Sequence, residues 1–223
     1  MAGLDGRVAI VTGAARGIGR AIAERLVAEG CAVTMTDRDG SILAVADEIG
    51  ALGVMGSVDD AIHVRAVVDT TVDRHGTVDI LVNNAGEVMA SGPRDDWQRA
   101  EADYERIFGS NTKGAFLFGR AVAPVMIANG GGEIVNVSTD HVKPCPDCEP
   151  HHGHGAMDLY NASKWALNGL TFDWARSLAR HRIRVNNLCM GATDTAMLRS
   201  WLRGTPTRRR WRRGCVRNRS PRC

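Results

Sequence analysis

Strand-type and helix-type patterns alternate along this chain about six times. Short runs rich in valine and isoleucine precede segments whose apolar residues recur every three or four positions. This alternation predicts an α/β fold with a doubly wound parallel sheet and helices on both faces. The expected strands are residues 7–13, 31–39, 53–58, 78–86, 133–139 and 183–189, and the expected helices are 19–30, 42–49, 64–72, 101–127 and 158–180. Residues beyond the carboxyl ends of the strands are therefore the candidates for ligand binding.

The chain has 223 residues, the length of one α/β domain, which we place at residues 1–202. Residues 203–223 contain nine arginines and no acidic residue; without these arginines the net charge of +3 would be −6. The body is thus mildly acidic. This tail has no helical or strand period, which favours disorder or an out-of-frame reading of a GC-rich gene over nucleic-acid binding.

Targeting and redox features favour a cytoplasmic protein. No apolar run is long enough to span a membrane, and the start MAGLDGRVAIVTG lacks the pattern of a signal peptide. The six cysteines are irregularly spaced and are expected to be reduced thiols. These features argue against a membrane or disulfide-stapled secreted protein.

The segment TGAARGIG, residues 12–19, follows the first expected strand and opens the first expected helix. Gly13 permits a tight turn, and Gly17 and Gly19 allow the backbone to approach a pyrophosphate. The helix N-terminus offers free N–H groups and a positive dipole end to phosphates. This arrangement predicts a dinucleotide site. The cofactor-binding residues expected within it are Gly13, Ala15, Arg16, Gly17, Ile18 and Gly19.

Asp37 ends the second expected strand, 18 residues after Gly19. A carboxylate at this position accepts hydrogen bonds from the ribose hydroxyls of adenosine and repels a 2′-phosphate. Arg16 and Arg38 act in the opposite direction, because a guanidinium pairs well with a phosphate. The balance favours NAD as cofactor, with NADP as the less favoured alternative.

Tyr160 and Lys164 are four residues apart in an expected helix, so they share one of its faces. An ammonium beside a phenol favours the phenolate. Lys164 is therefore expected to lower the pKa of Tyr160 from its usual value of about 10. Such a pair predicts a general acid–base that works nearer neutral pH.

Together these motifs resemble the short-chain dehydrogenase/reductase family. The matching segments, in family order within residues 1–202, are TGAARGIG (12–19), Asp37, NNAG (83–86), Asn111, IVNVST (134–139), YNASK (160–164) and RVNNLCMG (184–191). The resemblance implies a Rossmann-type fold and NAD(H)-dependent interconversion of a secondary alcohol and a ketone. It also implies a small-molecule substrate and a homo-oligomer.

The resemblance assigns roles to individual residues. Tyr160 would exchange the proton of the substrate hydroxyl, Lys164 would lower the pKa of Tyr160 and hold the nicotinamide ribose, and Asn111 would anchor a proton-relaying water. The family's catalytic serine corresponds to Thr139, with Ser138 as the alternative. The other cofactor contacts implied by the family are Ser57, Val58, Asn84, Ala85, Gly86, Gly191, Thr193 and Thr195.

Three further features depart from the family pattern. Ser57 stands where an aspartate usually meets the adenine, with Asp59 as a candidate replacement, and Met190 stands where a proline usually follows the sixth strand. The family's last helix and strand are missing after Leu202, which leaves the sixth strand at an exposed edge. We therefore expect low stability or activity and an uncertain oligomer. The alternative functions are an inactive nucleotide-binding remnant and a nucleic-acid binder that acts through the arginine-rich tail.

An insertion between the fifth strand and YNASK holds four of the seven histidines and a C-x-x-C pair, Cys145 and Cys148. Because it leaves the end of a strand, it is expected beside the nicotinamide. The leading interpretation is a substrate-lining lid in which His141 or His154 contacts a polar substrate. Structural zinc is the alternative, although three prolines stiffen the loop and the family chemistry needs no metal. A solvent-exposed loop is the third interpretation, and we assign no metal ligand.

Overall fold

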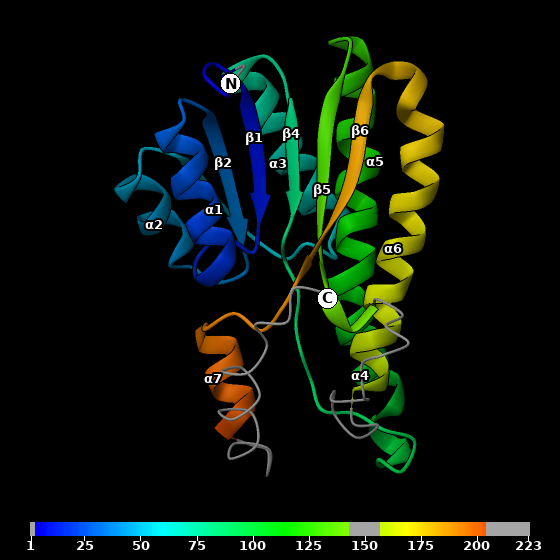
Figure 1. Cartoon of the computed structure of the whole chain (residues 1–223). Helices are drawn as coiled ribbons and strands as arrows, with labels where there is room; N and C mark the ends of the chain where they lie inside the picture. The colour runs from blue at the N-terminus through cyan, green and yellow to red at the C-terminus, as the bar shows by residue number, and fades with distance from the viewer. Residues whose placement is uncertain (1–2, 143–156, 204–223) are drawn as a thin grey trace, which may run out of the picture.

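A computed structural model describes residues 3–142 and 157–203. They form a parallel sheet between two layers of helices (Figure 1). The strands are β1 (Val8–Thr12), β2 (Ala32–Asp37), β3 (Leu52–Met55), β4 (Ile80–Asn83), β5 (Gly132–Thr139) and β6 (Ile183–Met190). All pairs are parallel and the order is β3-β2-β1-β4-β5-β6. The prediction of a doubly wound, Rossmann-type sheet is confirmed.

Two hydrophobic clusters fix the helices to the sheet. The α-helices are α1 (Gly17–Ala28), α2 (Ile42–Glu48), α3 (Ala61–His75), α4 (Trp97–Phe108), α5 (Gly114–Ala128), α6 (Asp158–Leu178) and α7 (Ala196–Arg203). The first cluster joins alternate residues of the strands, such as Ile10 and Leu81, to α3, α5 and α6. The second joins the intervening residues, such as Val11 and Val82, to α1 and α2. The central strands β1 and β4 thus bury both faces, as their continuous apolar runs predict, whereas the edge strands β3 and β6 remain partly exposed.

The segment expected to form one helix over 101–127 differs in its middle. A π-helical turn, Gly109–Lys113, separates α4 from α5 and carries the buried Asn111. Such wider turns recur at functional sites, because they change the direction in which a side chain points. The sequence pattern also missed α7, which lies beyond the carboxyl ends of the strands (Figure 1).

The strand order reverses between β1 and β4, where the chain leaves one half of the sheet for the other. Segments that follow the carboxyl ends of these strands diverge and leave a crevice that can accept a ligand. The glycine motif follows β1 and the NNAG motif follows β4. The topology therefore brings together two motifs that are about 70 residues apart in the sequence.

Several predictions fall mostly on residues outside the described part. The lid and zinc interpretations concern the loop 141–154, of which residues 143–154 are not described. The tail predictions concern residues 203–223, of which only Arg203, the last residue of α7, is described. Within residues 3–142 and 157–203, no helix is long and apolar enough to cross a membrane. In the same ranges, no group of three or more histidine, cysteine, aspartate or glutamate side chains is arranged to hold a metal ion.

Candidate functional site

A cavity of about 350 Å³ opens at the carboxyl ends of the strands, and most predicted site residues line it. Those in the lining are Gly13, Arg16, Gly17, Ile18, Asp37, Ser57, Val58, Asn84, Ala85, Gly86, Ser138, Thr139, Tyr160, Lys164, Gly191, Thr193 and Thr195. Ala15, Gly19 and Asn111 are buried behind this lining. The volume is in the range of small-molecule sites. One cavity thus contains both the motif predicted to bind the dinucleotide and the residues predicted to be catalytic.

The turn after β1 is locked against the loop after β4. Gly13 has a left-handed backbone, with φ of 64°, and a Cβ atom added to it would lie 2.7 Å from the Cα of Ala85. Only glycine fits such a position without strain. The amide nitrogen of Asn84 donates to the carbonyl oxygens of Thr12 at 2.9 Å and Gly13 at 3.0 Å. The two motifs therefore form one rigid wall of the cavity.

The N-terminus of α1 meets the requirements of a phosphate site. Its first residue, Gly17, lines the cavity and has φ of 61°. The N-cap residue, Arg16, makes no side-chain capping hydrogen bond, and the first turn contains no acidic residue. No side chain there competes with an anion for the first helical N–H groups. These residues fit the pyrophosphate of a dinucleotide.

Asp37 and Ser57 line the cavity beyond the ends of β2 and β3. The Asp37 carboxylate accepts hydrogen bonds from the backbone N–H groups of Ala15 and Asp39, both at 3.0 Å. This acid therefore ties the end of β2 to the glycine turn. The Ser57 hydroxyl donates a short hydrogen bond to Asp59, which is not among the lining residues. Of these two residues, Ser57 lines the cavity, and Asp59 contacts it only through the hydrogen bond to Ser57.

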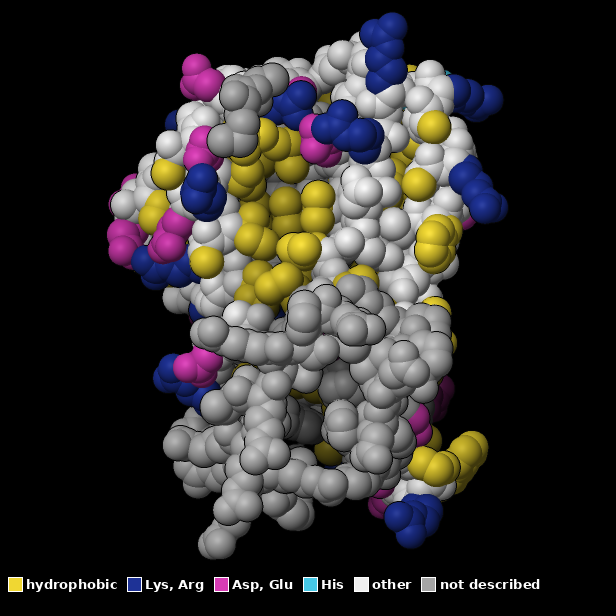
Figure 2. All heavy atoms as spheres, viewed as in Figure 1, with side chains coloured by type: hydrophobic (Ala, Val, Ile, Leu, Met, Phe, Trp, Pro, Cys, Tyr) yellow, Lys and Arg dark blue, Asp and Glu magenta, His cyan; other side chains and the backbone are white. Residues whose placement is uncertain are grey.

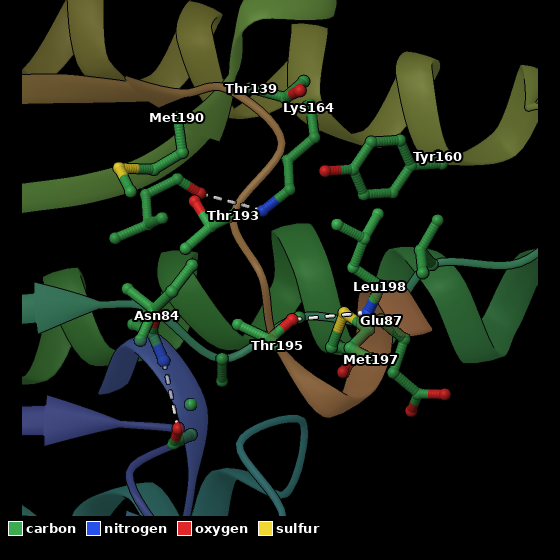
Figure 3. Close-up of a pocket in the computed structure, with 18 of the residues that line it drawn as sticks. Asn84, Glu87, Thr139, Tyr160, Lys164, Met190, Thr193, Thr195, Met197 and Leu198 are labelled. Carbon is green, nitrogen blue, oxygen red and sulfur yellow. Dashed lines mark hydrogen bonds between the residues drawn. The ribbon is translucent and has the colours of Figure 1, made fainter. Parts of the chain in front are cut away.

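Tyr160 and Lys164 project from the first turns of α6 into the same space (Figure 3). Lys164 is buried, and its Nζ donates to the carbonyl oxygen of Val137 in β5 at 2.8 Å. Burial lowers the pKa of Lys164 to about 8, because the charged amine loses its hydration. The amine therefore sits between the strand end and the cavity.

The expected effect of Lys164 on Tyr160 is wrong for this structure. The pKa of Tyr160 is raised, first by burial and also by the nearby Asp140 carboxylate, while a hydrogen bond with Thr139 acts in the opposite direction. The Nζ of Lys164 lies 6.0 Å from the centre of the Tyr160 ring and is directed at Val137. Because burial disfavours the charged phenolate, Tyr160 is held as a neutral phenol.

Thr139 and Ser138 point in different directions at the end of β5, as successive strand residues do. The Ser138 hydroxyl donates to the Oδ1 of Asn168 at 3.1 Å, so it is directed toward α6. The Thr139 side chain is hydrogen-bonded to Tyr160 and also donates to Asp140 at 3.3 Å. Of the two candidates, Thr139 is the one whose hydroxyl lies with Tyr160.

Asn111 joins the loop after β4 to α6. Its Oδ1 accepts from the backbone N–H of Glu87 at 2.7 Å, and its Nδ2 donates to the Glu87 carbonyl at 3.0 Å and to the Ser163 hydroxyl at 2.9 Å. The side chain is 1% exposed. In this arrangement Asn111 fixes the loop after β4 beside α6.

A family model described as short chain dehydrogenase matches residues 7–205. The chain belongs to the short-chain dehydrogenase family. Sorbitol dehydrogenase of Cereibacter sphaeroides is 37% identical over 195 residues, which are 86% of this chain and 72% of that protein. The (3R)-3-hydroxyacyl-CoA dehydrogenase of Mus musculus is 34% identical over 208 residues, 87% of this chain and 76% of that protein.

Solved structures agree with this membership. A 7α-hydroxysteroid dehydrogenase in complex with NADH and 7-oxo glycochenodeoxycholic acid superposes with a TM-score of 0.79 and 31% identity, covering 89% of this chain and 75% of that one. The family resemblance is thereby confirmed. This short-chain dehydrogenase has a Rossmann-type nucleotide-binding fold and is an oxidoreductase of a family that acts on CH–OH donors.

Sequence reasoning missed part of the lining of this dehydrogenase. Met197 and Leu198 of α7 and Glu87 of the loop after β4 line the cavity (Figure 3). A signal for α7 was present, because Thr195 is a good N-cap residue and its hydroxyl accepts from the N–H of Leu198 at 3.3 Å. No local signal identifies Glu87, whose partners are distant in the sequence.

Proposed function

We propose that this short-chain dehydrogenase interconverts a secondary alcohol and a ketone with NAD(H), and that Tyr160 transfers the proton. The observation that supports the proposal best is the convergence of Thr139, Tyr160 and Lys164 on a cavity that starts at the N-terminus of α1. This reaction requires the residue that transfers the proton to lie in the same site as the bound dinucleotide. A small-molecule substrate is the corresponding partner.

The chain's own residues fit the cofactor. The N-terminus of α1 would bind the pyrophosphate, Asp37 the adenosine ribose, and the residues after β6 the nicotinamide end. When bound, the nicotinamide accepts or supplies the hydride. Lys164 is the residue that the family resemblance assigns to the nicotinamide ribose, and its place in the cavity lining is consistent with that role.

Two hydroxyls handle the substrate oxygen in this proposal. In ketone reduction the Tyr160 phenol donates its proton to the oxygen, and in alcohol oxidation the Tyr160 phenolate accepts the proton of the substrate hydroxyl. Thr139 hydrogen-bonds the same oxygen and holds it beside Tyr160. Because burial raises the pKa of Tyr160, the side chain is a phenol near neutral pH, which is the form that donates a proton in ketone reduction.

The test is turnover of the purified full chain. Reduced-nicotinamide absorbance is followed with NAD(H) or NADP(H) and a panel of polyols, hydroxysteroids and 3-hydroxyacyl thioesters with their ketones. We expect Tyr160→Phe to lower kcat about 10²–10⁴-fold while NADH still binds, since only a proton-transferring hydroxyl is lost. Tyr104→Phe is the matched control, because Tyr104 stacks on Phe108 in α4 and does not line the cavity.

Two outcomes would contradict this proposal. Full turnover by Tyr160→Phe would remove Tyr160 from the reaction. Binding of NADH without turnover of any substrate would instead favour the inactive nucleotide-binding remnant, which the presence of Asn111, Tyr160 and Lys164 in one cluster of elements argues against.

A further inference from the structure

Two arginines lie near Asp37 at the adenosine end of the cavity, and a carboxylate binds each of them. Arg16 donates to Asp39 at 3.2 Å, and Arg38 donates to Glu87 at 2.6 Å. Both arginines line the cavity. A guanidinium in this region is the group that would attract the 2′-phosphate of NADP. The partners of these arginines therefore bear on which dinucleotide the site accepts.

Glu87 is held in place from three directions. Its side chain is only 12% exposed, and it accepts from Arg38 and from Arg106 of α4, both at 2.6 Å. Its backbone N–H and carbonyl are both bonded to the Asn111 side chain. A carboxylate fixed in this way is oriented before any ligand binds, so its hold on Arg38 needs no rearrangement.

The Arg38–Glu87 pair is better placed to persist than the Arg16–Asp39 pair. The Asp39 side chain is 39% exposed and Arg16 is 72% exposed, so water and salt weaken their attraction. Glu87 is largely shielded, and its second arginine completes a charge-assisted network. Glu87 is thus expected to bind Arg38 more strongly than Asp39 binds Arg16.

We propose that Glu87 is a specificity-determining residue of the cofactor site. By pairing with Arg38, Glu87 withholds that guanidinium from a 2′-phosphate and strengthens the preference for NAD. Asp37 excludes the phosphate by repulsion, and Glu87 removes an attraction that would offset this repulsion. The inference rests on the proposed dinucleotide-dependent function.

The experiment compares the affinities of NADH and NADPH for the full chain by fluorescence titration. In Glu87→Gln, Arg38 loses its carboxylate partner and becomes able to pair with the phosphate. We expect the ratio of the NADPH to the NADH dissociation constant to fall about tenfold, the scale of one charge-assisted pair. The double variant Glu87→Gln/Arg38→Ala should return the ratio to the wild-type value, because the gain depends on the Arg38 guanidinium.

Glu133→Gln is the matched control. Glu133, near the start of β5, also binds two arginines, Arg7 at 2.9 Å and Arg184. It lies at the opposite end of the strands from the cavity and is not among the lining residues. The substitution changes charge and shape identically, so the ratio should stay at the wild-type value.

The possible results are distinct. An unchanged ratio in Glu87→Gln, an equal fall in Glu133→Gln, or a fall that persists without Arg38 would each overturn the role of Glu87. If circular dichroism shows that Glu87→Gln is unfolded, Arg38→Ala tests the same idea, since an Arg38 already paired with Glu87 contributes nothing to NADPH selection. A marked rise of the ratio in Arg38→Ala would then overturn the inference. Failure of the wild-type chain to bind either dinucleotide would instead contradict the proposed function.

Discussion

Lys164 places an amine in the protein interior, and this burial has an energetic consequence. Its pKa is about 8 in the folded chain instead of 10.5. Below the folded value the amine is charged in both states, so the folded state bears the full desolvation penalty, which corresponds to about 3 kcal/mol. Between the two values only the unfolded chain holds the proton, so stability increases with pH across that interval.

We therefore expect Lys164→Met to raise the free energy of unfolding by about 2 kcal/mol near neutral pH, since the lost hydrogen bond to Val137 offsets about 1 kcal/mol. Turnover should be lost. The gain should shrink as the pH rises from about 8 and be gone above about 10.5, where the wild-type amine is neutral in both states. Denaturant unfolding of the variant and the wild type from neutral pH to above pH 10 measures this difference in the free energy of unfolding. Lys113→Met, at an exposed lysine of the π-helical turn, is the control and should show no such trend.

Thr139 and Ser138 allow a second prediction about single residues. Thr139→Ala should lower kcat about 10²–10³-fold, as expected for loss of one hydrogen-bond donor to the reacting oxygen. Ser138→Ala should instead lower the free energy of unfolding by about 1 kcal/mol, since it removes the bond to Asn168. Steady-state kinetics and thermal unfolding of both variants measure these effects. A larger fall in kcat for Ser138→Ala than for Thr139→Ala would reverse the assignment.

Sequence patterns predict which residues line the cavity better than they predict the electrostatics of those residues. The glycines and the Tyr160–Lys164 pair were identifiable, because turn geometry and helical spacing are local properties. The direction of the Tyr160 pKa shift was not, since it depends on burial and on Asp140, 20 residues away. Glu87 was missed for the same reason: its partner Arg38 is 49 residues distant.

At the scale of elements, the contact between α5 and α6 depends on one glycine. A Cβ atom added to Gly119 would overlap the ring of Trp174. Trp174 of α6 is 8% exposed and belongs to the first hydrophobic cluster. The absence of a side chain at Gly119 thus leaves room for the Trp174 ring of α6 against α5.

We expect Gly119→Ala to lower the free energy of unfolding by about 1–3 kcal/mol, because the indole ring must move within a packed core. Gly169→Ala in α6 is the matched control. A Cβ atom added there has no neighbour within 4 Å, so this change should stabilise the helix by up to about 1 kcal/mol. Thermal unfolding of both variants checks the prediction; equal effects would show that helix propensity, and not the ring contact, dominates.

The order of the elements was predictable, whereas the π-helical turn between α4 and α5 was not. Six strands and four of the five helical segments expected from apolar periodicity are found within a few residues of their expected places, and the fifth, 101–127, is divided into α4 and α5. The π-helical turn at Asn111 leaves no trace in that periodicity, since it is stabilised by contacts to Glu87 and Ser163. Tertiary hydrogen bonds of this kind lie outside any local pattern.

At the scale of the whole molecule, the sheet has one poorly covered region on the face that holds α1. A hollow of about 540 Å³ lies between Ile22 and Leu26 of α1 and Met190 at the end of β6. Hydrophobic side chains are visible across this face in Figure 2. In the described part of the chain, β6 is the last strand and has a paired neighbour on one side only. Edge strands with exposed apolar residues favour association between molecules.

Leu188 offers a direct test of this region. It pairs in register with Val137, shares its face of the sheet, and is 44% exposed. We expect Leu188→Lys to reduce self-association, because a charge on an edge strand opposes pairing with another copy. Light scattering after size-exclusion chromatography measures the mass. Leu43→Lys in α2 is the matched control, since Leu43 is 53% exposed on a helix with no open edge. Equal effects of both variants would attribute association to general surface hydrophobicity, and no effect of Leu188→Lys would exclude β6 as the contact.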